Sequence, residues 1–168
     1  MYGLSRMARN VRGQIIFPQD QSYLQSGEIE VVKKYGDIPL VECYRAQLNQ
    51  VFMNLINNAI DVLQSQSEQS PSDQGKKQII IQTERIDPVQ VKISFIDNGP
   101  GIPPDVYPKL FDPFFTTKPI GEGTGLGLAI CYKIIEKHQG RIAIDPNYQN
   151  GTQFDVIVPI TINTTIQP

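Results

Sequence analysis

The sequence predicts a two-layer α/β sandwich, in which a mixed β-sheet is covered by helices on one face. Segments that alternate apolar and polar residues are arranged as hairpins, and two longer segments place apolar residues three and four positions apart. The 168 residues, with 40% hydrophobic content, are enough for one domain with a real core. The resulting order of strands, helix, strands, loop, helix and strands favours this α/β class.

The first half of the chain predicts two strands, one helix and one loop. Residues 28–34 and 40–43 are typical of short strands around the turn Tyr35-Gly36-Asp37, and we expect them to pair antiparallel. The clearest helix runs from residue 45 to about 64. Residues 64–77 (QSQSEQSPSDQGKK) are poor in apolar residues and predict an exposed loop. The apolar face of the helix consists of Leu48, Val51, Phe52, Leu55, Ala59, Val62 and Leu63.

The second half predicts two hairpins separated by a helix. Residues 78–85 and 89–97 form the first hairpin around Asp87-Pro88, and 141–145 and 153–159 form the second through Asn150-Gly151. Between them, a helix extends from about residue 125 to His138 and ends at Gly140. We therefore predict one domain over residues 27–160. Residues 1–26 are expected to be a linker or the remnant of a preceding region, and 161–168 a tail.

Composition and spacing exclude several classes of protein. A net charge of −2 gives no sign of nucleic-acid binding. The apolar runs are too short for a membrane span and no leader is evident, so we expect a cytoplasmic domain. Cys43 and Cys131 lie far apart among apolar neighbours, which favours reduced core thiols over a metal or redox role. Neither GxGxxG nor GxxxxGK[ST] occurs, which excludes a Rossmann dinucleotide site and a P-loop.

Residues 97–128 (DNGPGIPPDVYPKLFDPFFTTKPIGEGTGLGL) combine a lone carboxylate with two glycine clusters. Asp97 shares the parity of the apolar residues on the preceding strand, so its carboxylate should point inward, where it needs hydrogen-bond donors. Gly99 and Gly101 leave room for a flat ring near the backbone, and the amides of GEGTGLGL lead into a helix, which suits anions. This stretch predicts half of a nucleotide pocket.

A polar stripe runs along the first helix beside its apolar face. Gln50, Asn54, Asn58 and Asp61 follow one another at steps of four, four and three residues. Asn is a weak helix former, so two of them one turn apart indicate a function rather than a solvated edge. Amide oxygens on adjacent turns can hold Mg²⁺, which favours hard oxygen ligands and keeps water and phosphate as its other ligands.

Four motifs in this order resemble those of the catalytic ATP-binding domain of sensor histidine kinases. LNQVFMNLINNAIDVL is similar to the N box of that family, DNGPGI to its first glycine box, KLFDPFFTTK to its F box and GTGLGL to its second glycine box. The superfamily also holds gyrase, a heat-shock chaperone family and the MutL mismatch-repair ATPases. The resemblance covers about residues 28–159. It implies the Bergerat-type ATP-binding fold, ATP as ligand and Mg²⁺ as cofactor.

The resemblance also implies roles for individual residues. Asn58, and with it Asn54, would hold the Mg²⁺ that bridges the phosphates. Asp97 would accept a hydrogen bond from the adenine amino group, and because an ionised carboxylate only accepts, ATP should be preferred over GTP. Residues 116–123 would form a mobile lid from which Lys118 reaches the terminal phosphate, so that Asn54 and Lys118 are the candidate catalytic residues. The implied nucleotide-contacting residues are Asn54, Asn58, Asp61, Asp97, Gly99, Gly101, Ile102, Phe111, Thr116, Thr117, Lys118, Gly123, Thr124, Gly125, Leu126 and Gly127.

Several positions keep two interpretations. Many family members carry Lys and Tyr three and four residues after the metal-binding Asn, where this chain has Asp61 and Val62. Asp61 either holds water or metal indirectly or is a solvated side chain. The phenylalanines of the F box are either apolar anchors that dock the lid or plain core residues, namely Phe111, Phe114 and Phe115.

The phosphoacceptor is a second departure from the family pattern. A full histidine kinase carries its reactive histidine on a dimerising helical hairpin that precedes this domain, whereas the only histidine of this chain is His138. It lies in EKHQG at the end of the last predicted helix, a position that the family often fills with His for structural reasons. We therefore expect a structural role for His138 and no autophosphorylation by this chain alone.

The leading hypothesis is a histidine kinase catalytic domain that transfers the γ-phosphoryl group of ATP to a histidine on another domain or chain. Its expected partners are a histidine-bearing dimerisation domain, in cis or in trans, and a response regulator downstream, while the isolated domain is expected to be monomeric. One alternative is a gyrase- or MutL-type ATPase clamp, which needs a carboxylate where this chain has Asn54. Another alternative is a nucleotide-sensing module without transfer activity. A kinase that transfers the phosphoryl group to serine is a weaker, fourth hypothesis.

Overall fold

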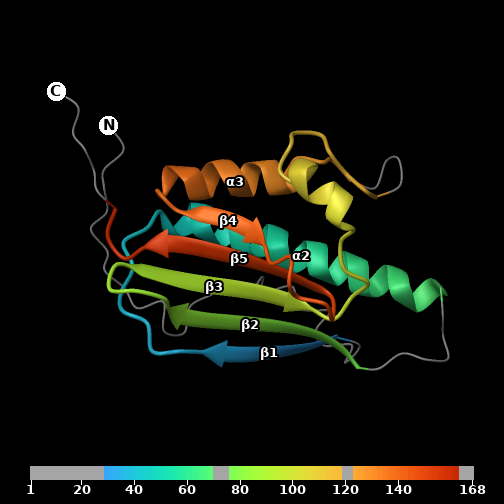
Figure 1. Cartoon of the computed structure of the whole chain (residues 1–168), viewed down its shortest axis with the longest axis horizontal. Coiled ribbons are helices and arrows are strands. Elements are labelled where there is room, and N and C mark those ends of the chain that lie inside the picture. The colour runs from blue at the N-terminus through green and yellow to red at the C-terminus, as the bar shows by residue number, and fades with distance from the viewer. Residues whose placement is uncertain (1–28, 70–75, 119–122, 163–168) are drawn as a thin grey trace.

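The computed structural model describes residues 29–69, 76–118 and 123–162, which form a five-stranded mixed sheet with helices on one face (Figure 1). α2 (Arg45–Gln69) and α3 (Gly127–Lys137) pack against each other over the sheet, and the short 3₁₀ helix η1 (Pro104–Lys109) lies between β3 and α3 in the chain. The predicted two-layer sandwich is confirmed. The predicted linker (1–26), residues 163–168 of the tail and residues 119–122 of the predicted lid lie outside the described residues.

The strand order is β1-β2-β3-β5-β4. β3 (Gln90–Asp97) lies between β2 (Lys77–Arg85) and β5 (Thr152–Pro159) and pairs antiparallel with both, and β4 (Arg141–Ile144) pairs antiparallel with β5. Both predicted hairpins are therefore confirmed, although Asn150-Gly151 ends a longer connection between β4 and β5 rather than forming a two-residue turn.

The prediction for the first strands is wrong, because β1 (Ile29–Tyr35) pairs parallel with β2. Residues 40–43 form no strand; they lead into α2, and the N–H group of Glu42 donates to the carbonyl oxygen of Ile160 at 2.8 Å. A helix that separates two neighbouring strands brings the second strand back in the same direction as the first, which is the connection made by β1, α2 and β2. Gly36 does not form the predicted hairpin turn. Instead, its N–H group donates to the carbonyl oxygen of Thr83 at 2.8 Å.

The core lies between α2 and the sheet. All predicted core residues of the helix are buried except Val62, which is half-buried, and Ile56 joins them without having been predicted. The rings of Phe52 on α2 and Phe95 on β3 lie 5.4 Å apart between centroids. The inward-facing residues of the sheet include Ile79, Ile81, Val91, Ile93, Phe95, Ile142, Phe154, Val156 and Val158.

α2 is longer than predicted and takes up part of the predicted loop. It continues to Gln69, because the Gln, Ser and Glu residues of this segment are compatible with a helix even though they are not apolar. Lys77, predicted to be exposed, begins β2 and is only 9% exposed. The remaining residues of that predicted loop, 70–75, lie outside the described residues.

α3 ends close to Gly140, as predicted, but the residue that takes the left-handed conformation after the helix is not this glycine. Gln139, at φ 56°, takes the left-handed position after the helix, and the N–H group of Gly140 donates to the carbonyl oxygen of Ile135 at 3.0 Å. A Cβ on Gly140 would lie 2.3 Å from the carbonyl oxygen of Ile157 on β5. Gly140 therefore allows the backbone to pass close to the sheet.

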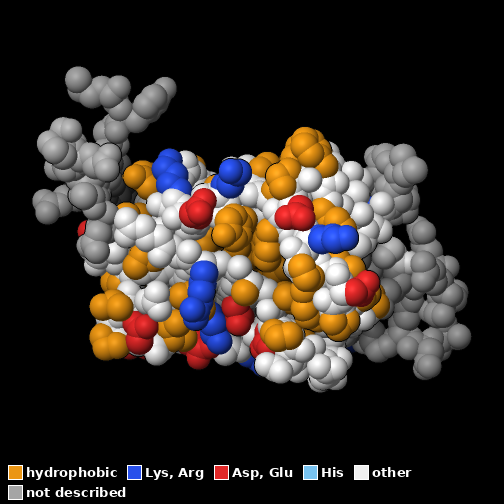
Figure 2. All heavy atoms as spheres, turned by 45° about the horizontal axis from the view of Figure 1, so that its top comes forward, with side chains coloured by type: hydrophobic (Ala, Val, Ile, Leu, Met, Phe, Trp, Pro, Cys, Tyr) orange, Lys and Arg blue, Asp and Glu red, His pale blue; other side chains and the backbone are white. Residues whose placement is uncertain are grey.

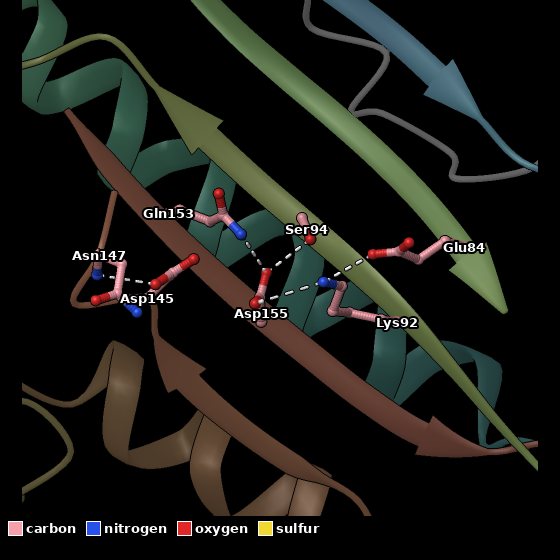
Figure 3. A network of polar contacts seen from close by, with 7 residues as sticks. All are labelled: Glu84, Lys92, Ser94, Asp145, Asn147, Gln153 and Asp155. Carbon is pink, nitrogen blue, oxygen red and sulfur yellow. Dashed lines mark hydrogen bonds and ion pairs between the residues drawn. The ribbon is translucent and has the colours of Figure 1, made fainter. Parts of the chain in front are cut away.

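The sheet face opposite to the helices carries a network of polar side chains (Figure 3). The Oδ1 atom of Asp155 accepts hydrogen bonds from Ser94 Oγ at 2.6 Å and from Gln153 Nε2 at 3.0 Å. Lys92 Nζ lies 2.7 Å from Glu84 Oε1 and 3.9 Å from Asp155 Oδ2. These contacts link β2, β3 and β5 in register, and they lie away from the helices that carry the candidate site.

Candidate nucleotide-binding site

Asp97 ends β3 and is 6% exposed, which confirms that its side chain points inward. Its Oδ1 atom accepts hydrogen bonds from the N–H groups of Gly99, at 2.9 Å, and Thr152, at 3.3 Å. Burial raises the pKa of Asp97 above its ordinary value, and these two N–H groups, together with the hydroxyl of Thr152, act against that shift by donating to the carboxylate. Both N–H donors use Oδ1, and a carboxylate has about four lone-pair sites, so at least one acceptor site remains for a ligand.

Three glycines bring the backbone close together around Asp97. A Cβ on Gly99 would lie 2.8 Å from Asp97 Oδ1 and 3.0 Å from Val62 Cγ1. Gly101 has φ 78°, and a Cβ there would lie 3.1 Å from the carbonyl oxygen of Gly151. Gly151 has φ 137°, and a Cβ on it would lie 2.0 Å from the carbonyl oxygen of Asp97. Side chains at these positions would therefore collide with the end of the strand.

Asn54 joins α2 to the beginning of α3. Its Nδ2 atom donates to the carbonyl oxygen of Gly127 at 3.3 Å and to Cys131 Sγ at 3.6 Å. A carbonyl oxygen can only accept, so the nitrogen of the Asn54 amide must face α3, which leaves Oδ1 as the atom available for a cation. The predicted core thiol is confirmed for Cys131, since it is fully buried and burial raises its pKa to about 11. Cys43 is half-buried, and neither cysteine forms a disulfide.

Asn58 and Asp61 continue the polar stripe along α2. Asn58 is half-buried, and in the described part of the chain its amide makes no hydrogen bond to protein. Asp61 is exposed, and its Oδ2 atom lies 2.5 Å from Lys118 Nζ. Neither sequence-based interpretation of Asp61 included this ion pair, because the two residues are 57 positions apart.

The two segments that flank the predicted lid (residues 116–123) are joined by a hydrogen bond between Phe114 and Gly125. The N–H group of Phe114 donates to the carbonyl oxygen of Gly125 at 3.0 Å, and the two residues have φ values of 67° and 64°. A Cβ on Gly125 would lie 2.4 Å from the carbonyl carbon of Phe114, so this contact requires glycine. Thr116 Oγ1 accepts a hydrogen bond from the N–H group of Lys118 at 3.1 Å, and Gly123 lies beside both residues.

The phenylalanines of the F box differ in exposure. Phe111 is half-buried, packs against the core, and its ring lies 5.8 Å from that of Tyr132 on α3. Phe115 is also half-buried, whereas Phe114 is 75% exposed. The core interpretation therefore fits Phe111 and fails for Phe114. Ile102 is another half-buried residue that packs against the core.

Side chains of α2 lie beside three of the sequence motifs. Gly99 of the first glycine box lies beside Val62, Lys118 pairs with Asp61, and Gly127 of the second glycine box bonds to Asn54. Leu126 caps the beginning of α3, and its N–H group donates to Thr124 Oγ1 at 3.3 Å. Thr117 is exposed. Of the predicted residues, Gly99, Lys118 and Gly127 thus lie beside α2.

His138 has the structural role that its position predicts. It is 1% exposed; Nε2 accepts a hydrogen bond from the N–H group of Tyr44 at 3.0 Å, and Nδ1 lies 2.7 Å from the carbonyl oxygen of Ile134. Because Nε2 accepts, Nδ1 carries the proton and donates to Ile134. Burial lowers the pKa of His138 below its ordinary value. Both ring nitrogens are therefore occupied.

Sequence reasoning missed Thr152, Gly151 and Val62 as neighbours of the site. Thr152 lies opposite Asp97 in the register of β5 on β3. The Asn150-Gly151 turn signal, together with the alternation of β5, could have placed both residues beside the end of β3. Val62 was assigned to the core because its spacing matches that of the apolar face.

A comparison with protein families gives a match over residues 43–162 to the histidine kinase-, DNA gyrase B- and HSP90-like ATPases. The matched segment contains α2, Asp97 and both glycine boxes. The chain belongs to this ATPase family. The family resemblance predicted from the four motifs is thereby confirmed. Within the described residues, no helix of this ATPase domain is long and apolar enough to cross a membrane.

Known relatives of this ATPase domain are histidine kinases. Sporulation kinase E of Bacillus subtilis (strain 168) is 35% identical over 97% of this chain, which spans 20% of that kinase. The catalytic domain of histidine kinase ThkA, in a nucleotide-free form, has a TM-score of 0.67 and 34% identity, with 84% of this chain and 86% of that chain covered. A structure of ThkA in complex with the response regulator protein TrrA has a TM-score of 0.64 and 32% identity, and 86% of this chain and 38% of that chain are covered. The fold is that of a histidine kinase catalytic domain.

Proposed function

We propose that this domain binds Mg·ATP and transfers the γ-phosphoryl group to a histidine on a separate domain or chain, within a two-component sensor histidine kinase. The observation that carries transfer, rather than hydrolysis, is the hydrogen bond from Asn54 Nδ2 to the carbonyl oxygen of Gly127. A hydrolysing clamp needs a carboxylate at this place to activate water. An amide cannot act as that base, and here its nitrogen is turned toward α3.

The buried carboxylate of Asp97 is suited to recognise adenine. The N–H groups of Gly99 and Thr152 both donate to Oδ1 and support the ionised form. The carboxylate can then accept a further hydrogen bond from the adenine amino group, whereas guanine presents an oxygen acceptor at the same position. Gly99 and Gly101 keep the neighbouring backbone free of side chains, so that the flat ring can lie against it.

The amide oxygens of Asn58 and Asn54 fit Mg²⁺, which prefers hard oxygen ligands and keeps phosphate and water as its other ligands. The described residues hold no cluster of three or more His, Cys, Asp or Glu side chains that could bind a metal, so the protein ligands of Mg²⁺ would be these amides. When bound, the ion would neutralise charge on the phosphates. Asn54 is oriented for this task by Gly127, and Asn58 keeps its amide free of protein hydrogen bonds among the described residues.

The phosphates would lie between the beginning of α3 and Lys118. The first N–H groups of an α-helix have no partner within the helix, and at the beginning of α3 no side chain of the described residues forms a cap hydrogen bond. Lys118 lies at the border of the predicted lid and supplies a positive charge at the same end of the site. Positioning and charge neutralisation would carry the transfer.

Apolar side chains beside α3 offer a surface for the histidine-bearing helical hairpin. Phe114 is 75% exposed, Tyr132 46% and Ile130 37%, and all three lie on α3 or at the base of the lid. Apolar groups and charges of both signs share the face shown in Figure 2. ThkA forms a complex with a response regulator, and we propose that a response regulator likewise follows this kinase.

Phosphotransfer to a separately produced helical hairpin with a phosphoacceptor histidine tests this function. With Mg²⁺ and γ-labelled ATP, we expect label on the hairpin and none on the domain, because His138 is buried and both its ring nitrogens are occupied. ATP binding without transfer to the hairpin would indicate a nucleotide-sensing module. Fast release of phosphate without labelling would indicate a hydrolase. Either result would contradict the proposal.

A further inference from the structure

Asp61 and Lys118 connect α2 to the segment that follows the F box. Asp61 Oδ2 lies 2.5 Å from Lys118 Nζ, and the side chains are 51% and 31% exposed. Asp61 follows Asn58 by three residues, so the carboxylate lies one turn further along the same polar stripe. The cation that would serve the phosphates is therefore paired with an acid of the same polar stripe.

The backbone around Lys118 directs its side chain toward α2. The N–H group of Lys118 donates to Thr116 Oγ1 at 3.1 Å, which fixes the turn before it. A Cβ on Gly123 would lie 3.2 Å from Lys118 Cβ and 3.3 Å from Lys118 Cδ. The bare backbone at Gly123 thus leaves space for the aliphatic part of Lys118, and the ammonium group meets Asp61.

We propose that Asp61 is the resting counter-ion of Lys118, and that the phosphates of the nucleotide displace it. Asp61 is then a positioning residue. Its carboxylate holds the ammonium group of Lys118 next to the site before ATP binds, and the ion pair breaks when ATP binds. This inference rests on the proposed function, because phosphates must enter the site for the exchange to occur.

The strength of the ion pair suits such an exchange. Exposed pairs between Lys and Asp contribute little to stability in water, because solvent screens them and both side chains lose freedom. A nucleotide brings several negatively charged oxygens close together, so its phosphates attract the ammonium group more strongly than one carboxylate does. Asp61 also repels the phosphates directly. Both effects make Asp61 weaken the binding of ATP and ADP, but only the first depends on Lys118.

A double-mutant cycle separates the two effects. Binding of ATP, ADP and adenosine is measured by calorimetry for the wild type, Asp61→Asn, Lys118→Met and the double variant. In the wild-type background, Asp61→Asn should tighten ATP and ADP binding by about two- to fivefold, the range for an exposed ion pair, and leave adenosine unchanged. In the Lys118→Met background the same change should tighten binding clearly less. The difference between the effects of Asp61→Asn in the two backgrounds measures the contribution of the ion pair.

Glu136→Gln serves as the matched control, since it removes one negative charge from an exposed position on α3 and should leave binding unchanged. If Asp61→Asn weakened Mg·ATP binding, Asp61 would support the metal or its water instead. If Asp61→Asn had equal effects in both Lys118 backgrounds, it would act only by repulsion. Either result would overturn the inference while the wild type still bound ATP. Failure of the wild type to bind ATP would instead overturn the proposed function.

Discussion

Asn54 Nδ2 donates a hydrogen bond to the carbonyl oxygen of Gly127, 3.3 Å away, and so links the middle of α2 to the first residue of α3. The same nitrogen lies 3.6 Å from Cys131 Sγ, which is fully buried. The two motifs that contribute these residues are far apart in the sequence, yet one amide group fixes how they meet. The nitrogen of Asn54 bonds to α3, and its oxygen is the atom that we propose as a ligand of the metal.

Asn54→Asp should destabilise the domain without creating a hydrolase. A carboxylate would have no hydrogen to donate to Gly127, so two oxygens would face each other beside a buried thiol. We expect the free energy of unfolding to fall by about 0.5 to 1.5 kcal/mol, the net contribution of one hydrogen bond. Urea denaturation and phosphate release measure both effects. Asn57→Asp adds the same charge at an exposed neighbouring position, and equal stability of the two variants would contradict the structural role of Asn54.

Asn58→Ala should weaken Mg·ATP far more than metal-free ATP. Its amide oxygen is proposed to act through the ion, so loss of the side chain removes a ligand of the metal and leaves the adenine contacts intact. We expect a loss of about tenfold or more with Mg²⁺ and little loss in EDTA. Calorimetric titration in both conditions measures this difference. Equal losses in the two conditions would remove Asn58 from the metal site.

The sequence predicted the elements of this fold better than their pairing. The inward direction of Asp97 follows from the period of two along β3, which depends only on local geometry. The parallel pairing of β1 with β2 does not follow from local geometry, because the strands are joined through α2 and the partner of β1 lies more than forty residues away. A nearby turn signal at Gly36 suggested the wrong partner.

Individual side-chain contacts in the site were less predictable still. Asn54 and Asn58 could be singled out because Asn is unfavourable in a helix without a reason. The pairing of Asp61 with Lys118 depends on how the loop returns to α2, and no local pattern reports that. Likewise, the apolar character of Phe114 suggested a core or docking residue, but its backbone at φ 67° turns it to the surface.

The pH dependence of stability should contain a contribution from His138. Burial lowers its pKa in the folded protein, so the neutral form stabilises the fold above the ordinary imidazole pKa of about 6.5, and this stability is lost as the pH falls through the lowered value. The loss cannot exceed about 1.4 kcal/mol per pH unit for one proton. Urea denaturation at pH 7.5 and 5.5 should show a smaller change for His138→Gln than for the wild type. Identical changes would mean that another group causes the acid sensitivity.

Gly125→Ala should open the base of the lid. A Cβ there would lie 2.4 Å from the carbonyl carbon of Phe114, and φ 64° is unfavourable for Ala, so the hydrogen bond between Phe114 and Gly125 should break. We expect a loss of about 1 to 3 kcal/mol in the free energy of unfolding. Gly127→Ala is the matched control for stability, because its Cβ would meet only Asn54 Cγ at 4.0 Å. Equal stability of both variants would show that this contact is dispensable.

Asp97→Asn should weaken ATP binding and stabilise the empty domain. The loss of the charged acceptor should cost about 1.5 to 3 kcal/mol of binding and narrow the preference for ATP over GTP. Burial raises the pKa of Asp97 in the folded state, so ionisation opposes folding: the stabilising contribution is complete below the unfolded carboxyl pKa of about 3.9 and is lost as the pH rises through the folded value. The Asn variant should therefore be more stable than the wild type at pH 7, and the difference should shrink toward pH 4.

Competition binding and urea denaturation of the empty protein at pH 7 and 4.5 measure these two effects of Asp97→Asn. Asp105→Asn removes the same charge from an exposed position on η1 and should change neither quantity. If Asp97→Asn kept the affinity and selectivity of the wild type, the role of Asp97 would be only structural, at the end of β3. If it lost both binding and stability at pH 7, the hydrogen bonds to Gly99 and Thr152 would need the charged form to hold the strand end together. Weaker binding combined with higher stability is the pattern expected of a carboxylate whose burial costs folding energy and serves the ligand.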